Sequence, residues 1–334
     1  MATELPSYVQ IEPVGQCNLR CQMCAIQFRR DGPPWGPLAF MDFDDFTRVV
    51  DQFPALTELH LQGLGETMLY PRYFDMVRYA AGRGIRVSTN SNLTALSPRR
   101  AELAVRSGLD CLHVSLDGAT AATYERIRVG ARFDRVVRNV ETLLAARARL
   151  GGDRPRIRLV SVVMRQNLHE LPDLVRLAQR WGVEGHFVQH LCHDFGESSL
   201  PAHYRPMRDF VECQTLLNED PVRVAHYFDA ARAVAGELGV DLRLPRTRPR
   251  AHPPGTPGRQ RCGWPWTGAY VSYQGYVMPC CMVSTPDRVN FGSLRDTAVE
   301  AIWDGTDFGE FRARLASDDP PEICRSCAIY TGTF

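Results

Sequence analysis

Three cysteines lie close together near the start of the chain. Cys17, Cys21 and Cys24 fall within the stretch GQCNLRCQMC of residues 15–24. A closed tetrahedral metal site needs four protein ligands, whereas three ligands leave one coordination position open. Three thiolates can also hold three irons of a [4Fe–4S] cluster and leave the fourth iron free for an exchangeable molecule. We therefore expect an open metal centre in this loop; a zinc site or unrelated buried cysteines are the alternatives.

Alternating strands and helices over the first two hundred residues provide a frame for such a site. The expected strands are residues 7–13, 56–63, 85–92, 109–118, 156–167 and 183–191. The segments between them space their apolar residues as helices do, and this alternation implies parallel strand–helix units. Six units would form an α/β fold, a partial (β/α)6 TIM-like barrel with functional residues at the C-terminal ends of its strands. The three cysteines follow the first of these strands.

The chain is expected to divide into three segments. Residues 1–200 form the barrel, and residues 201–261 form a helical bridge that ends in a linker rich in proline and arginine. Residues 262–334 form a small module with a β-hairpin, whose turn suits Gln274-Gly275, followed by a helix around residues 294–305.

Charge and composition narrow the class of partner and the compartment. The 334 residues carry a formal net charge of +1, which gives no general attraction to nucleic acid or to an anionic membrane. A small, modestly polar substrate suits this charge better. The N-terminal residues lack the features of a signal peptide, so we expect a cytoplasmic protein. In a reducing compartment the eleven cysteines are better suited to metal ligation or catalysis than to disulfides. Cys111 and Cys213 are expected in the core.

The C-x3-C-x2-C arrangement of the first three cysteines resembles the radical S-adenosylmethionine (SAM) superfamily. In that family the open iron binds the amino and carboxylate groups of SAM. The reduced cluster passes one electron to SAM, which is cleaved to methionine and a 5′-deoxyadenosyl radical that removes hydrogen from the substrate. The resemblance implies that Cys17, Cys21 and Cys24 hold this cluster and that a reducing partner such as flavodoxin or ferredoxin supplies the electron.

Residues after the later strands extend the resemblance. Gly65 and Glu66 resemble the family's Gly-Gly-Glu element, which receives the SAM amino group, although Leu64 stands where glycine is commoner. Arg128 is a candidate partner for the SAM carboxylate, since an arginine fork suits that group. Taken singly, each residue could equally be a turn, cap or surface residue. The complete set expected at SAM is Gly65, Glu66, Ser88, Asn90, Asn92, Ser115, Asp117 and Arg128.

The C-terminal cysteines resemble the SPASM/Twitch extension of many radical SAM enzymes. The resemblance implies an auxiliary [4Fe–4S] cluster held by Cys262, Cys280, Cys324 and Cys327. Cys281 is either a spare buried thiol or an alternative to Cys280, because adjacent cysteines rarely both reach one cluster. A zinc site with the same four ligands is the alternative. The cysteines of a second auxiliary cluster are missing, which favours the shorter Twitch form.

A group of titratable side chains after the sixth strand is the candidate for substrate chemistry. We expect catalytic roles for His190, Cys192, His193 and Glu197, with two core histidines and a buried thiol as the alternative. If Cys192 faces the cavity, it could return a hydrogen atom to the substrate radical and invert a stereocentre. Otherwise a histidine or Glu197 could accept a proton while the auxiliary cluster accepts an electron, which leaves a ketone.

The size and layout resemble small radical SAM enzymes of antibiotic pathways. The resemblance implies a carbohydrate-like substrate, such as an aminoglycoside, an aminocyclitol or a sugar nucleoside, with epimerisation or dehydrogenation as the outcome. Decarboxylation of a sugar acid is one alternative. Modification of a peptide is another, placed second because the first strand begins near Tyr8 and leaves little room for a leader-binding domain. A binding module without SAM cleavage is the non-enzymatic alternative.

Overall fold

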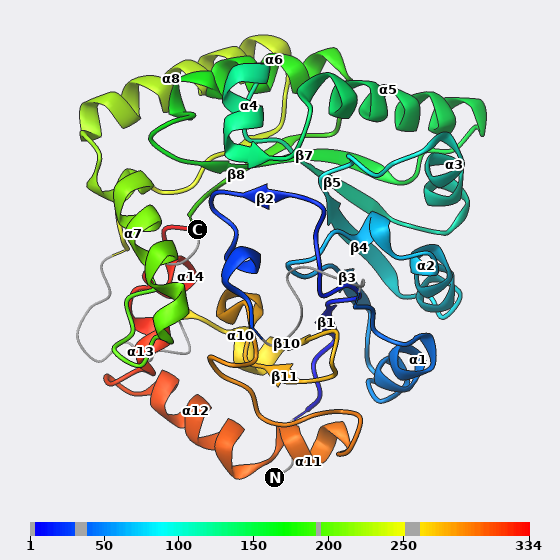
Figure 1. The fold of residues 1–334 in the computed structure, drawn as a ribbon, viewed down its shortest axis with the longest axis vertical. Coiled ribbons are helices and arrows are strands. Elements are labelled where there is room, and N and C mark those ends of the chain that lie inside the picture. Colours follow the sequence, from blue (N-terminus) through cyan, green and yellow to red (C-terminus); the bar gives the residue numbers. More distant parts are fainter. Residues whose placement is uncertain (1–3, 31–38, 192–194, 251–260) are drawn as a thin grey trace.

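The computed structural model describes residues 4–30, 39–191, 195–250 and 261–334. One nine-stranded sheet organises the chain, with the strand order β11-β10-β1-β3-β4-β5-β7-β8-β9. Figure 1 shows this sheet curving around the centre of the molecule, with helices on its outside. The curved parallel sheet confirms the predicted α/β barrel-like fold.

Six parallel strands form the barrel part of the sheet. They are β1 (Tyr8–Ile11), β3 (Glu58–Leu61), β4 (Arg86–Ser91), β5 (Cys111–Ser115), β7 (Arg156–Val163) and β8 (His186–His190). Each lies within one of the six ranges expected from the sequence. The helices that join them are α1 (Phe43–Asp51), α2 (Tyr73–Ala81), α3 (Pro98–Arg106), α4 (Ala121–Ile127), α5 (Phe133–Arg149) and α6 (Leu171–Arg180).

Local sequence explains why these elements form. In α5, Val136, Val140 and Leu143 are completely buried and recur at helical spacing, so one stripe of the helix covers the sheet. Helix α1 begins where the Asp42 side chain accepts a hydrogen bond from the Asp44 amide at 2.8 Å. Such amphipathic, capped helices favour packing on the outer face of the sheet.

The C-terminal module continues the barrel sheet. Strand β10 (Gly268–Val271) pairs in parallel with β1, and β11 (Val277–Met278) pairs antiparallel with β10. The predicted hairpin is therefore present, with Gly275 at a φ of +91° in its turn. The helix expected around residues 294–305 is shorter, α11 (Val299–Trp303), because residues 293–297 form a hydrogen-bonded turn. The module ends in α12 (Thr306–Ala316), α13 (Glu322–Arg325) and α14 (Ala328–Thr331).

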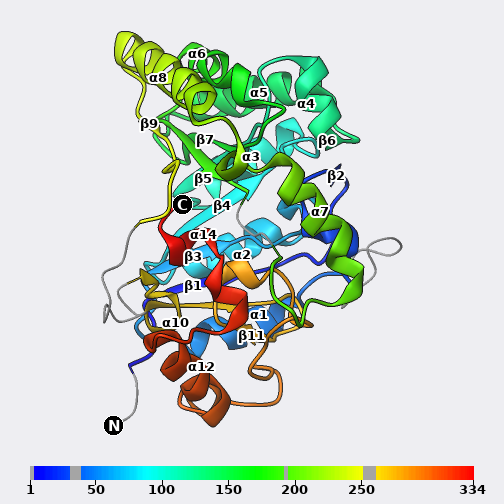
Figure 2. The same cartoon turned by 90° about the vertical axis from the view of Figure 1, so that its left-hand side faces the viewer.

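The bridge between barrel and module consists mainly of two helices, α7 (Arg205–Gln214) and α8 (Pro221–Leu238). Helix α8 packs against α6, and the short strand β9 (Leu242–Arg243) adds in parallel to β8. Both views place α8 and α6 at one end of the molecule and α12 at the other (Figures 1 and 2). Within the described residues, no helix combines the length and apolar character needed to span a membrane.

The two faces of the barrel sheet differ in polarity. In β4, Val87, Thr89 and Ser91 are buried, whereas Ser88 and Asn90 on the opposite face keep some solvent contact. The same alternation recurs in β3, β5 and β7. The helix-covered face is therefore sealed by packing, and the concave face of the barrel is polar and partly accessible.

Candidate active site

The loop with the first three cysteines is anchored at the C-terminal side of the barrel strands. Its short strand β2 (Arg20–Cys21) pairs antiparallel with β6 (Arg128–Val129), and this register sets Cys21 opposite Arg128. Arg20 donates to the Cys17 carbonyl oxygen at 2.7 Å, and Gln27 donates to the Cys21 carbonyl oxygen at 2.6 Å. These bonds fix the backbone of the loop and leave its three sulfur atoms available.

The surroundings of the three thiols suit ligation of an iron–sulfur cluster. Burial raises the pKa values of Cys17 and Cys24 and raises that of Cys21 to about 12, so the free thiols stay protonated at neutral pH until a cation binds. Two donors already face one of the sulfurs: Leu19 N lies 3.4 Å and Asn92 Nδ2 3.7 Å from Cys17 Sγ. Hydrogen bonds to sulfur are a regular feature of cluster sites.

The spacing of these side chains does not match a single zinc ion. Nowhere in the described ranges do three His, Cys, Asp or Glu side chains converge closely enough for one metal ion. Zinc ligands must approach one point within roughly 2.3 Å, whereas the thiolates of a cluster bind separate irons. The wider spacing of both groups of cysteines is compatible with a cluster, whose thiolates bind separate irons.

Gly65 and Glu66 cross the backbone that leads into the cysteine loop. A Cβ on Gly65 would lie 2.0 Å from the Val14 carbonyl oxygen, so only glycine fits. Glu66 N donates to the Gln16 carbonyl oxygen at 2.9 Å. The Glu66 carboxylate is buried and accepts bonds from Ser91 Oγ at 2.6 Å, Asn92 N at 2.8 Å and Met68 N at 3.0 Å. Burial raises the pKa of Glu66, and its three donors oppose that shift.

The three residues predicted from the STNSN stretch lie at different depths. Asn92 reaches the cysteine loop, since its Nδ2 donates to Cys17 Sγ and lies 3.3 Å from Asn18 Oδ1. Asn90 lies on the concave face of β4, further from the cysteine loop than Asn92. Ser88 lies further away still, and its Oγ is 2.8 Å from His60 Nδ1. Only Asn92 of the three contacts the cysteine loop directly. Ser91, which the sequence analysis passed over, holds Glu66.

Asp117 and Arg128 bind each other. Arg128 Nε lies 2.7 Å from Asp117 Oδ2, and both side chains are almost fully buried. Asp117 Oδ1 also accepts from Val162 N at 2.8 Å, while Arg128 NH1 lies 3.9 Å from Cys21 Sγ. Asp117 therefore orients Arg128 toward the cysteine loop. Ser115, the other residue expected here, lies on the concave face at the end of β5.

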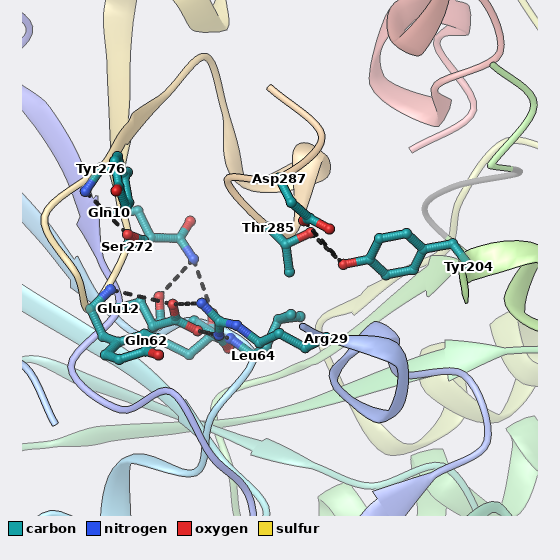
Figure 3. A network of polar contacts seen from close by, with 12 residues as sticks. Gln10, Glu12, Arg29, Gln62, Leu64, Tyr204, Ser272, Tyr276, Thr285 and Asp287 are labelled. Carbon is teal, nitrogen blue, oxygen red and sulfur yellow. Dashed lines mark hydrogen bonds and ion pairs between the residues drawn. The ribbon is translucent and has the colours of Figure 1, made fainter. Parts of the chain in front are cut away.

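A buried ion pair that the sequence did not reveal connects these loops. Arg29 donates from NH1 to Glu12 Oε1 at 2.7 Å and from NH2 to Glu12 Oε2 at 2.9 Å, and neither side chain has solvent exposure. Leu64 N also donates to Glu12 Oε1 at 3.0 Å, and Arg29 stacks over the Tyr273 ring at 4.9 Å. Figure 3 shows Glu12 and Arg29 side by side within this network. The pair joins β1, the cysteine loop, the Gly65 loop and the C-terminal module.

Two of the four residues predicted for substrate chemistry, His190 and Glu197, form contacts with other parts of the protein. His190 is buried, and its Nε2 donates to the Arg246 carbonyl oxygen at 2.7 Å. Glu197 is buried and forms an ion pair with Arg288, whose side chain is 1% exposed. These contacts favour structural roles at the start of the bridge over proton transfer. Cys192 and His193 lie outside the described residues.

Four C-terminal cysteines line one apolar cavity. The walls of this cavity include Cys262, Cys280, Cys324 and Cys327 but not Cys281. Burial raises the pKa of Cys280 well above its ordinary value and raises that of Cys262 to about 11. A sheltered space bounded by four thiols fits an auxiliary cluster. Of the two cysteines expected in the core, Cys111 is buried, but Cys213 is exposed because it lies on the outer side of α7.

The neighbouring pair Cys280 and Cys281 provides a matched test of this cavity. We expect Cys280→Ser to lower the iron content of anaerobically reconstituted protein by about four irons per chain. Cys281→Ser should leave the iron content unchanged, because Cys281 does not line the cavity. Iron and sulfide analysis measures both. The reverse result would make Cys281 the ligand.

His60, on the concave face, should make the fold acid-sensitive. Burial lowers its pKa from 6.5 to about 3. As the pH falls, this histidine is therefore protonated in the unfolded chain before it is protonated in the folded chain. The contribution of neutral His60 to the free energy of unfolding is complete above about pH 6.5 and is lost as the pH falls toward 3. We expect His60→Gln to reduce the loss of unfolding free energy between about pH 7 and about pH 5 by up to about 2 kcal/mol. Urea unfolding at both pH values measures this, and equal acid sensitivity of the two proteins would contradict it.

Comparison with known families agrees with this geometry. The profile of the radical SAM superfamily matches residues 11–178, which include the first three cysteines. The profile of an iron–sulfur cluster-binding domain named SPASM matches residues 262–328, which include the C-terminal cysteines.

Curated relatives match over nearly the whole chain. A tungsten-containing aldehyde ferredoxin oxidoreductase cofactor-modifying protein of Pyrococcus furiosus is 30% identical and aligns with 96% of this chain and 87% of its own length. An AdoMet-dependent heme synthase of Methanosarcina barkeri is 27% identical over 98% and 89%. A PqqA peptide cyclase of Ruegeria pomeroyi is 26% identical over 98% and 81%.

Solved structures share the fold at low sequence identity. SuiB of Streptococcus suis bound to its precursor peptide SuiA aligns with a TM-score of 0.68 at 14% identity, covering 99% of this chain and 71% of SuiB. The native anSMEcpe structure with bound AdoMet aligns with a TM-score of 0.66 at 16% identity, covering 98% and 88%. The site geometry, the two profiles and the relatives lead to one conclusion: the chain belongs to the radical SAM superfamily and carries a C-terminal SPASM domain, so its cofactors are a radical SAM [4Fe–4S] cluster, SAM and an auxiliary cluster.

Proposed function

We propose that this chain modifies a peptide by radical chemistry. Its relatives include a peptide cyclase that aligns with 98% of this chain. The carbohydrate-like substrate expected from size and layout has no support among the three relatives described above, and the epimerase and dehydrogenase outcomes therefore give way to the peptide alternative. When bound, SAM and the reduced cluster supply the radical that removes hydrogen from the substrate.

One structural observation carries this proposal. An open groove of about 660 Å³ lies directly beside the end of the cysteine loop. One wall is formed by residues 27–30, at the end of the 3-10 helix η1 (Ala25–Phe28) that follows Cys24, and the other by Ala202, His203 and Pro206 at the start of α7. A wide, open groove suits an extended chain, whereas small ligands usually occupy enclosed sites that bury most of their surface.

In the proposed reaction, separate groups of residues hold the first cluster, attract SAM and hold the auxiliary cluster. Cys17, Cys21 and Cys24 hold the first cluster, and Gly65, Glu66 and Asn92 shape the adjoining side of the loop. Arg128, oriented by Asp117, contributes positive charge beside Cys21 and can attract the carboxylate of SAM. Cys262, Cys280, Cys324 and Cys327 hold the auxiliary cluster.

Anaerobic turnover tests the proposal. The reconstituted protein is incubated with SAM and dithionite, together with either a pool of synthetic peptides or a panel of aminocyclitols and sugar nucleosides. We expect peptides to increase 5′-deoxyadenosine formation and to change mass, while the sugar panel has no effect. Stimulation by the sugar panel alone would reject the peptide proposal in favour of the carbohydrate one.

A further inference from the structure

One arginine on the concave face of the barrel, Arg158, forms no ion pair with any residue that the structure describes. Arg158 is the third residue of β7 (Arg156–Val163), and the strand register sets it opposite His113 of β5, which in turn lies opposite Asn90 of β4. Arg158 shares the partly accessible face with these two residues. It therefore belongs to the polar interior of the barrel.

Within the described residues, the Arg158 guanidinium forms no ion pair, and its buried Nε has no hydrogen-bond partner. Arg156, two residues earlier on the same face, is different because its NH2 lies 2.5 Å from Asp110 Oδ2. A guanidinium that is partly shielded from water and has no anionic partner loses hydration without a compensating ion pair. Such costs persist in proteins where function requires them.

Two neighbouring side chains on this face, His113 and Cys111, do not neutralise Arg158. Burial lowers the pKa of His113, and the charges of Arg158 and Arg156 lower it further, so His113 is neutral at physiological pH. Its Nε2 lies 3.6 Å from Cys111 Sγ. Burial raises the pKa of that thiol, although both arginines oppose the shift, so Cys111 is also uncharged. The positive charge therefore remains available to a ligand.

Arg158 also lies at the right depth to meet a substrate. The strand register sets Asn90 at the same height along the barrel as Arg158. Asn92, two residues further along the chain, donates to Cys17 Sγ. Two strand residues span about 6–7 Å. A molecule that enters the barrel beneath the first cluster can thus extend to Arg158.

We propose that Arg158 binds a carboxylate group of the substrate inside the barrel. The planar guanidinium fork matches a carboxylate with two parallel hydrogen bonds. The identification of the substrate as a peptide rests on the proposed function, and the carboxylate is then an acidic side chain or a C-terminus. Arg158 would select acidic substrates and fix their position.

The binding of small carboxylates tests this without turnover. The reconstituted protein with SAM is titrated with three probes: N-acetylglutamic acid amide carries only a side-chain carboxylate, N-acetylglutamine only an α-carboxylate, and N-acetylglutamine amide neither. The rise in thermal unfolding midpoint gives each Kd. We expect at least one acidic probe to bind, and Arg158→Met to weaken it about tenfold or more. The acidic probe that binds more tightly identifies the source of the carboxylate.

Stability separates a binding role from a structural one. Arg158→Met should unfold at the same temperature as the wild type or higher, because it removes an unpaired charge. Arg158→Lys should still bind the acidic probe, but more weakly than the wild type does. Arg156→Met is the matched control and should keep wild-type affinity. Unchanged affinity in Arg158→Met, a lower midpoint in that variant, or equal binding of all three probes would overturn the proposal. The assay is independent of peptide turnover, so it can fail or succeed separately from the proposed function.

Discussion

Arg29→Met is expected to lower the free energy of unfolding by about 3–5 kcal/mol, the usual cost of removing one partner of a buried ion pair. The variant leaves the Glu12 carboxylate without its bidentate partner in a site with no solvent exposure. It also removes the cation that stacks on Tyr273 and joins the C-terminal module to the barrel. Anaerobic denaturant unfolding measures the effect.

Two further variants show whether the cost arises from the unpaired buried charge. Glu12→Gln combined with Arg29→Met removes both charges and keeps an oxygen to accept from Leu64 N, so we expect it to recover more than half of the loss. Arg138→Met breaks an ion pair with Asp134 whose side chains are 64% and 59% exposed, and should change stability by less than about 0.5 kcal/mol. Equal effects of Arg29→Met and Arg138→Met would contradict the assigned role.

Cys24→Ala is expected to reduce SAM cleavage by at least about a thousandfold, because two thiolates cannot retain the first cluster in place. The matched control is Cys213→Ala, which removes an exposed cysteine on α7 and should keep full activity. The readouts are iron content and 5′-deoxyadenosine after anaerobic reconstitution. Cleavage by Cys24→Ala at the control's rate would remove this cysteine from the cluster.

The positions of the barrel strands and the spacing of the first three cysteines could be predicted because short-range sequence patterns encode them. Alternating apolar residues indicate strands such as β7, and the spacing of Cys17, Cys21 and Cys24 needs no tertiary information. The hairpin around Gly275 follows from its turn sequence, since glycine readily adopts a positive φ. These features depend on residues near one another in the chain.

Contacts between distant segments were not predictable. Glu12 and Arg29 carry no local sign that they pair, and Glu66 gives none that Ser91 and Asn92 bind its carboxylate. His190 and Glu197 could be identified as buried or catalytic, but only the folded chain shows their partners, Arg246 O and Arg288. The pairing of β10 with β1 likewise joins segments about 260 residues apart, beyond the reach of periodicity.

The most direct test of the account is whether SAM binds to the cluster of the first three cysteines. We would freeze dithionite-reduced protein with SAM labelled by ¹⁵N in its amino group and record electron–nuclear double resonance. The account predicts a hyperfine coupling from the labelled nitrogen, which is lost in Cys24→Ala and kept in Cys280→Ser. Absence of coupling in wild-type protein saturated with SAM would contradict an open iron at Cys17, Cys21 and Cys24.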